Sequence, residues 1–425
     1  MRPHSPRPRW IPLPVIGCVL ALLAHRGWAD DSLRPTAPLG VASVPSDPIF
    51  AALLTDGSVV SGRVVQVDAA QGVTLAGAGG EERTIAVGRL VKLTRDGSMP
   101  PPMVEGGIVL LPRGDRLTRC VIKAAGDTTL SVLWESTGGT LAVPLDGMIG
   151  LILDPPKGVD AVDAFEARVR GETRAAEQLW LANGDKLDGL FAGLTDKQVM
   201  FQPPTGRVAL ARPAVTAIGF NPAQVVEQDL AGPFYEWLLL DGSRLGLGQT
   251  RVDRGLVIGQ TRFGVEVRIP LGEVARIRVL NSSVVYLSDR DADKVVYESY
   301  LGPTRPYRRG ASVVGPALRL GGQTYDRGLG TQSRTLLAYR LDPKAKRFQA
   351  LVGLDDAAGP LGNVVFKVLV DGKPRYESPS MGAGEAPRAV DVALEGGKVL
   401  ILTTEFGERG DVQDSGDWVE ARIIR

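Results

Sequence analysis

Histidine and cysteine are almost absent from this chain of 425 residues. Both histidines, His4 and His25, lie within residues 1–29, and Cys120 is the one cysteine beyond that segment. Without residues 1–29 the chain has no internal disulfide, no Ser-His-Asp or Cys-His catalysis and no His-ligated metal site. We expect Cys120 to be a buried small hydrophobic residue, because no histidine is present to activate its thiol.

Long apolar runs are also scarce, and the one example follows the N-terminus. The basic segment 1–9 precedes the apolar segment 10–24, and Gly27-Trp28-Ala29 supplies small residues at the cleavage positions. This order predicts a signal peptide over 1–29, a linker over 30–47, and export to the periplasm, cell surface or medium. Acylation of Cys18 as a lipoprotein is the alternative. No later run is long enough for a transmembrane segment in the mature chain.

A strong charge excess is missing as well. Residues 1–29 contain four arginines and no acid, so the remainder carries 45 basic and 48 acidic side chains. This balance predicts no nucleic-acid partner. Because no histidine remains, we expect ligand binding to be flat between about pH 5.5 and 7.5. Chemistry would have to rest on carboxylates, Lys, Tyr or an oxygen-ligated metal.

What the chain does contain is short strands and turns, in four similar segments. Apolar strands run into turn glycines at Gly57, Gly114, Gly184 and Gly242, and each segment ends in another apolar strand. We predict four small β units of Sm-like or SH3-like architecture that pack on one another. Their ranges are 48–97, 104–155, 179–222 and 232–280, and a helical linker spans 158–178. We expect Trp134, Trp180 and Trp237 to be packing residues.

The texture changes near Val284, where longer strands alternate cleanly, as in "NVVFKVLVDGK" (363–373). Such strands predict an antiparallel β-sandwich over 284–425. The fold class is therefore all-β. Five motifs stand in this region: "YLSD" (286–289), "YDRGLGTQS" (325–333), "FQALVGLDD" (348–356), "VVFKVLVDGK" (364–373) and "DSGDWVEARI" (414–423).

In order and spacing these motifs resemble the NPCBM/NEW2 domain, the carbohydrate-binding module of family 98 glycosyl hydrolases and related proteins. The resemblance implies a galactose-binding-like jelly roll that binds glycans without catalysis, often with a structural Ca²⁺. Two family histidines are replaced: Gln332 stands in the Gly-Thr-His-Ser motif, and Ser415 in Asp-His-Ala-Asp-Trp. Gln332 keeps a donor and an acceptor but cannot titrate.

A sugar needs an aromatic face and planar polar groups. We therefore predict the carbohydrate-binding residues Trp418, Asp417, Gln332, Tyr300 and Tyr307. Asp355, Asp356 and Asp414 are the predicted calcium ligands, because Ca²⁺ prefers carboxylate oxygens. Burial between sheets is the alternative for Trp418. Gly328 and Gly330 are expected to shape a turn before a strand; a phosphate loop is disfavoured, because no helix follows.

Three interpretations of function remain. The first is a secreted, non-catalytic glycan-binding protein. The second is an envelope or extracellular interaction or structural protein, in which the jelly roll is a protein-docking surface. The β units are further candidates for contact with other envelope proteins. The third is a glycosidase, which would need two facing carboxylates drawn from Asp355, Asp356, Asp411 and Asp414.

Overall fold

The computed structural model describes residues 47–425 except 98–104, 172–173, 227–231, 299–303 and 409. In these ranges the one α-helix is α1 (Val159–Gly171), inside the predicted helical linker, and the prediction of an all-β fold is confirmed. No helix in the described ranges is both long and apolar enough to cross a bilayer. The predicted signal peptide, Cys18, the linker up to residue 46 and Tyr300 lie outside the described residues.

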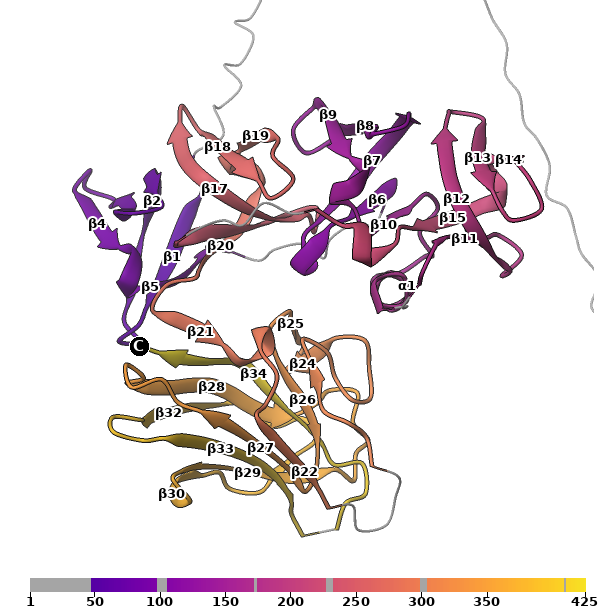
Figure 1. Cartoon of the computed structure of the whole chain (residues 1–425). Coiled ribbons are helices and arrows are strands. Elements are labelled where there is room, and N and C mark those ends of the chain that lie inside the picture. Colours follow the sequence, from indigo (N-terminus) through magenta and orange to yellow (C-terminus); the bar gives the residue numbers. More distant parts are fainter. Residues whose placement is uncertain (1–46, 98–104, 172–173, 227–231, 299–303, 409) are drawn as a thin grey trace, which may run out of the picture. The chain divides into compact units, whose positions relative to one another are not determined.

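Residues 49–280 form four groups of five strands, with a single 3₁₀ turn before each fifth strand (Figure 1). Unit 1 contains β1 (Ile49–Leu54), β2 (Val59–Asp68), β3 (Gly72–Ala76), β4 (Glu82–Ala86) and β5 (Leu90–Arg95). Unit 2 contains β6 (Gly107–Leu110), β7 (Arg116–Ala125), β8 (Thr129–Trp134), β9 (Gly139–Pro144) and β10 (Gly150–Ile152). Unit 3 contains β11 (Glu177–Leu181), β12 (Lys186–Leu194), β13 (Gln198–Gln202), β14 (Val208–Ala211) and β15 (Val215–Gly219). Unit 4 contains β16 (Phe234–Leu239), β17 (Arg244–Asp253), β18 (Leu256–Thr261), β19 (Glu266–Pro270) and β20 (Val274–Leu280).

The second strand of every unit carries a β-bulge. The register against the third strand shifts at Val64/Gln66, Ile122/Ala124, Phe191/Gly193 and Gly248/Arg251. A bulge bends its strand and increases the local twist, which lets a long second strand curl around a small core. The turn between the first and second strands contains a glycine with positive φ in three units: Gly57 (+85°), Gly184 (+91°) and Gly242 (+88°).

Two pairs of units join through their last strands, and β7 of unit 2 also pairs with β12 of unit 3 and β17 of unit 4. β5 of unit 1 pairs antiparallel with β20 of unit 4, and β10 of unit 2 pairs with β15 of unit 3. All four contribute to one hydrophobic core, in which Trp134 and Trp237 are completely buried. A unit of about 50 residues buries little core alone, so sharing strands and core stabilises each of them.

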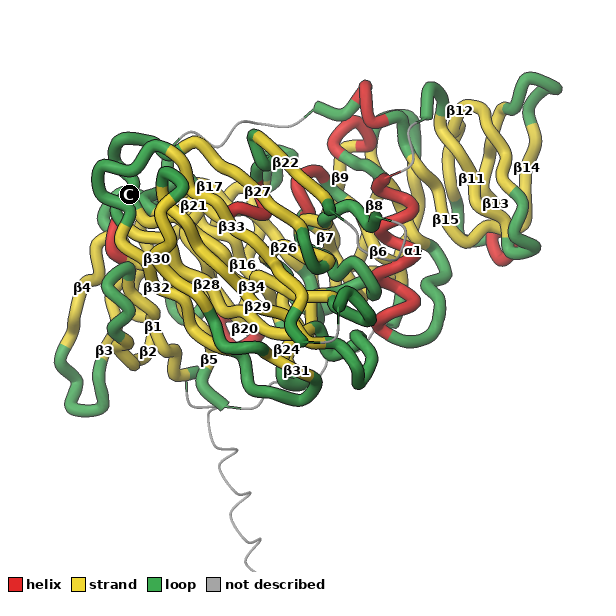
Figure 2. Tube along the Cα trace, turned by 90° about the horizontal axis from the view of Figure 1, so that it is seen from below, coloured by secondary structure: helices red, strands yellow, loops and turns green. Residues whose placement is uncertain are grey.

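Residues 284–424 form a sandwich of two antiparallel sheets (Figures 1 and 2). The first sheet contains β21 (Val284–Tyr286), β23 (Arg308–Arg309), β26 (Gly328–Gln332), β28 (Arg347–Leu354), β32 (Arg388–Ala393) and β34 (Ser415–Ile424). The second contains β22 (Lys294–Tyr297), β27 (Thr335–Arg340), β29 (Asn363–Val370), β30 (Lys373–Glu377), β31 (Met381–Gly382) and β33 (Val399–Phe406), while β24 (Leu318–Leu320) and β25 (Gln323–Tyr325) form a separate hairpin. Alternation places Val364, Phe366, Val368 and Val370 in the core between the sheets.

Gly328 and Gly330 lie inside β26 and not in a turn before a strand, as the sequence had led us to expect. A Cβ at Gly330 would stand 2.4 Å from the carbonyl oxygen of Ala311, and one at Gly328 2.5 Å from that of Trp418. These glycines therefore permit close backbone approach to neighbouring segments.

A group of buried and half-buried charges joins the sandwich to units 1 and 4. We call it the interface cluster: Lys92, Glu236, Arg244, Arg276, Arg278, Asp326, Arg327 and Glu420. Arg278, 1% exposed, donates to Asp326 and Glu420, each at 2.7 Å. Arg327 donates to Glu236 at 2.9 Å, and Lys92 to Glu420 at 3.0 Å. Burial alone would raise the pKa of Glu420, but Arg278 and Lys92 outweigh it and lower the pKa to about 2.

Candidate functional site

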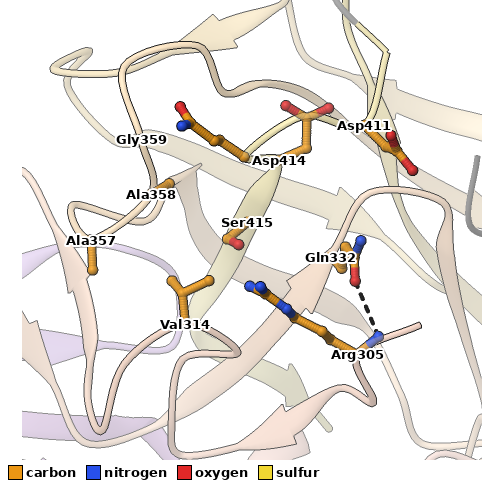
Figure 3. Close-up of a pocket in the computed structure, with 10 residues that line it drawn as sticks. Arg305, Val314, Gln332, Ala357, Ala358, Gly359, Asp411, Asp414 and Ser415 are labelled. Carbon is orange, nitrogen blue, oxygen red and sulfur yellow. Dashed lines mark hydrogen bonds between the residues drawn. The ribbon is translucent and has the colours of Figure 1, made fainter. Parts of the chain in front are cut away.

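A pocket of about 470 Å³ opens at one end of the sandwich (Figure 3). Four segments converge on it: the connection between β22 and β24, the end of β26, the loop after β28 and the loop before β34. Its lining residues are Arg305, Val314, Gln332, Ala357, Ala358, Gly359, Asp411, Gln413, Asp414 and Ser415.

Local hydrogen bonds hold the loops that form the pocket. Asp355 accepts from the backbone N–H of Ala357 at 2.7 Å, which fixes the turn after β28. Gln413 accepts from the N–H of Leu361 at 2.9 Å and so ties the loop before β34 to the loop after β28. Gln332 accepts from the N–H of Arg305 at 3.1 Å. Gln332 and Gln413 therefore brace the pocket that they also line.

Asp414 is the most deeply placed charged group of the pocket, with 2% of its surface exposed. One carboxylate oxygen accepts from the N–H of Asn363 at 2.7 Å, and the other has no hydrogen-bond partner among the described residues. Burial raises the pKa of Asp414 to about 6; neighbouring Asp411 adds to this effect, and the N–H of Asn363 opposes it. The pocket therefore contains one group that titrates near neutral pH, although no histidine is present.

Several donors at the pocket have no partner within the described part of the chain. They are the guanidinium of Arg305, the side-chain amide N–H groups of Gln332 and Gln413, and the hydroxyl of Ser415. Val314, Ala357 and Ala358 supply apolar wall. Unpartnered donors, a carboxylate and methyl groups in one cavity suit a small polar ligand with some apolar surface.

Two predicted sugar-binding residues are buried elsewhere. Trp418 is 0% exposed in the core, its ring 5.1 Å edge-on from that of Phe366 and its indole N–H donating to Thr404 at 3.0 Å. The prediction that Trp418 stacks on a sugar is wrong, since no face of its ring is open. Asp417, the next residue towards the N-terminus, is also 0% exposed and does not line the pocket.

Tyr307, another predicted sugar-binding residue, does not line the pocket. The hydroxyl of Tyr307 accepts from the N–H of Ala292 at 3.1 Å, and its ring packs against the sandwich core. Tyr307 thus has a structural role and no place in the pocket lining. Tyr300 lies outside the described residues. Of the five predicted residues, Gln332 lines the pocket.

The predicted calcium ligands lie in three different settings. Asp356 accepts from the N–H groups of Gly321 and Gly322 at 3.0 and 2.8 Å. Asp355 lies beside Asp417, and Asp414 lines the pocket. Among the described residues no three acidic, His or Cys side chains come together as a metal site. The set Asp355, Asp356 and Asp414 therefore does not fit a calcium ion.

Asp355 and Asp417 form a different pair. Asp355 is 2% exposed, and neither carboxylate oxygen of Asp417 has a hydrogen-bond donor partner in the described ranges. Burial, followed by a side-chain hydrogen bond with Asp355 and then by the charge of Asp355, raises the pKa of Asp417 well above its usual value of 3.8. Such a pair requires a proton or a cation between its oxygens.

Sequence reasoning missed Arg305, Gln413 and Ser415. The signal for Ser415 was available, because it replaces a family histidine just as Gln332 does, and both replacements line the pocket. Arg305 and Gln413 stand in loops without a motif, so only the fold brings them to the site.

Residues 283–424 match the family model described as the NPCBM/NEW2 domain. This segment is an NPCBM/NEW2 domain. The resemblance seen in the sequence is thereby confirmed for about a third of the chain.

Two curated relatives each match about a quarter of this chain. A Renibacterium salmoninarum protein named "Putative endo-alpha-N-acetylgalactosaminidase" is 34% identical over 110 residues, which are 26% of this chain and 7% of that protein. Alpha-1,3-galactosidase B of Akkermansia muciniphila is 29% identical over 107 residues, 24% of this chain and 13% of that protein. The similarity thus spans less than a seventh of either relative.

Solved structures similar to the chain include modules with bound sugars. The CBM51 of a Clostridium perfringens GH95 protein, in complex with methyl-galactose, is 25% identical, covers 33% of this chain and 99% of that chain, and has a TM-score of 0.30. CBM51-2 of Clostridium perfringens ZmpB, in complex with GlcNAc, is 22% identical, covers 40% and 36%, and has a TM-score of 0.31.

Proposed function

We propose that this protein is an exported, non-catalytic glycan-binding protein whose NPCBM/NEW2 domain holds a sugar in the pocket of Gln332, Asp414 and Ser415. The observation that carries the proposal is that both positions where the family histidines are replaced line the pocket, together with four further polar side chains (Figure 3). The motif positions and the cavity therefore coincide in three dimensions.

The groups present match the chemistry of a sugar. Hydroxyls of a sugar accept from Arg305, Gln332 and Gln413, and one hydroxyl or a bridging water satisfies the free oxygen of Asp414. The methyl groups of Val314, Ala357 and Ala358 cover a C–H face. Among the described residues no aromatic ring lines the pocket, so the described groups bind a sugar mainly through hydrogen bonds and we expect a modest affinity.

The glycosidase interpretation finds less support. Asp355 is buried beside Asp417, and Asp356 is bonded to two glycine N–H groups, so neither faces the pocket. Asp411 and Asp414 remain, and both are recessed, with 9% and 2% of their surfaces exposed. A binding role uses the groups of the pocket as they stand.

A structural Ca²⁺, which the resemblance implies, would lie between Asp355 and Asp417. The unpartnered oxygens of Asp417 are suited to a cation, and two carboxylates cancel its charge. Backbone carbonyls or water would complete its oxygen shell. A proton shared between the two carboxylates can supply positive charge in place of Ca²⁺. A chelator distinguishes the two alternatives, because it removes Ca²⁺ and leaves a proton in place.

Binding of methyl-galactose and GlcNAc to the full chain, measured by isothermal titration, tests the proposed function. We expect at least one sugar to bind, and Gln332→Ala to weaken it. The matched control is Gln323→Ala, which changes an exposed glutamine outside the pocket lining. Absence of binding to any sugar of a broad glycan array would leave the envelope-interaction alternative in its place.

A further inference from the structure

Arg305 differs from most other arginines near the sandwich. Its guanidinium lines the pocket and forms no ion pair or hydrogen bond with any described residue. By contrast, the four arginines of the interface cluster each pair with at least one carboxylate. A guanidinium that lines a cavity without a carboxylate partner remains available to a ligand.

The backbone holds Arg305 in place at the pocket. Its N–H donates to Gln332, which fixes the start of the side chain, and the guanidinium extends over the cavity towards Val314 and Ser415 (Figure 3). The amide N–H groups of Gln332 and Gln413 also have no partner within the described residues. Three side chains therefore offer donors to the same space.

The acids of the pocket lie deeper than these donors. Asp414 and Asp411 are 2% and 9% exposed, whereas Arg305 and Gln413 are exposed. One oxygen of Asp414 is already bonded to the N–H of Asn363. An entering ligand therefore meets a permanent cation and amide donors before it meets a carboxylate.

We infer that the pocket prefers sugars that carry a carboxylate or a sulfate, and that Arg305 is the residue that determines this specificity. The inference rests on the proposed glycan-binding function. A guanidinium binds a carboxylate or sulfate through two parallel N–H···O bonds, and such charge-assisted bonds are about twice as strong as neutral ones. Gln332 and Gln413 then bond the neighbouring hydroxyls.

The test compares matched ligands on the full chain by isothermal titration: methyl-galactose, galacturonic acid, galactose 6-sulfate and sodium sulfate. We expect the two acidic sugars to bind about tenfold tighter than methyl-galactose, an advantage that weakens with added salt. Arg305→Gln should remove the advantage. Arg309→Gln, which changes an exposed arginine paired with Asp291 and outside the pocket lining, should keep it.

The other outcomes separate the inference from the proposed function. Equal binding of acidic and neutral sugars, unaltered by Arg305→Gln, overturns the inference and leaves glycan binding intact. Sodium sulfate binding as tightly as galactose 6-sulfate overturns it too, because the pocket would then be a simple anion site. If none of the sugars binds, the inference and the proposed function both fail.

Discussion

The interface cluster and the pocket use similar side chains in opposite ways. In the interface cluster each cation is within 3.2 Å of a carboxylate oxygen, and Arg278 contacts three acids. In the pocket Arg305 has no carboxylate partner among the described residues, and an oxygen of Asp414 is unbonded. Charges paired within the chain serve its architecture, while charges left unpaired at a cavity are available for a ligand.

Removing a charge from the interface cluster should produce the largest effect. Arg278→Met keeps most of the side-chain volume but leaves Asp326 and Glu420 without their shared partner. We expect a loss of about 3–5 kcal/mol in the free energy of unfolding, the usual result of breaking one side of a buried ion pair. Urea unfolding followed by circular dichroism measures it.

The matched control for that experiment is Arg268→Met, which removes an exposed arginine paired with Glu266. An exposed pair contributes about 0–1 kcal/mol, so unfolding should hardly change. Similar losses in the two variants would show that the interface cluster is no more important than a surface pair.

Trp418 belongs with the architecture and not with the pocket. Trp418→Ala removes a completely buried ring that contacts Phe366 and Phe348. We expect a loss of about 3–5 kcal/mol of stability from the cavity created. The sugar affinity of the variant, measured below its unfolding transition, should stay within about threefold of that of the parent protein. A stable variant that no longer binds sugar would show that Trp418 contributes to the binding site.

These corrections show what the sequence could and could not predict. The alternation of apolar residues and the turn glycines were sufficient to predict an all-β chain. The motifs around Gln332 and Ser415 were sufficient to predict the sandwich and part of its pocket. Trp418 was misplaced because a motif gives the position of a residue along a strand and not which side of the sheet it faces. The place of Arg305 at the pocket and the contact between Asp355 and Asp417 could not be predicted, because they depend on loop conformation and strand register in the folded chain.

Removal of calcium should have an intermediate effect. If Asp355 and Asp417 hold Ca²⁺, EDTA lowers the stability of the parent protein by about 2–3 kcal/mol at metal concentrations near 100 times the dissociation constant. Asp417→Asn should lose this sensitivity to EDTA. A parent protein unaffected by EDTA would show that the pair shares a proton.

The metal-free protein should then depend on pH in a defined direction. The pKa of Asp417 is raised above 3.8 in the folded state, so its protonated form favours folding. The contribution is complete below about pH 4 and is lost as pH rises through the raised pKa. Thermal unfolding in EDTA at pH 5 and pH 8 measures this loss.

Acid should weaken sugar binding through Asp414, contrary to the flat profile expected from the lack of histidine. With a pKa of about 6, Asp414 is ionised at pH 7.5 and mostly protonated at pH 5. If the carboxylate accepts from a sugar hydroxyl, methyl-galactose should bind about tenfold more weakly at pH 5 than at pH 7.5. Asp414→Asn should flatten the profile; a parent profile that is already flat would place Asp414 outside the contact.

The smallest effect on sugar binding is expected from removing the four β units, which leaves the sandwich with its pocket but without its partners in the interface cluster. All ten residues that line the pocket lie between Arg305 and Ser415, and none of them belongs to the interface cluster. Residues 284–425 also have a hydrophobic core of their own, so we expect this segment to unfold cooperatively when produced alone. Its charged face, with Asp326, Arg327 and Glu420, becomes hydrated and costs little, because water replaces the lost ion pairs. The sugar affinity of the segment should therefore agree with that of the full chain within about twofold, because the pocket forms the same hydrogen bonds to the sugar in both. A tenfold loss in a well-folded segment would show that units 1 and 4 shape the pocket from a distance, and would end the separation between architectural and ligand-facing charges.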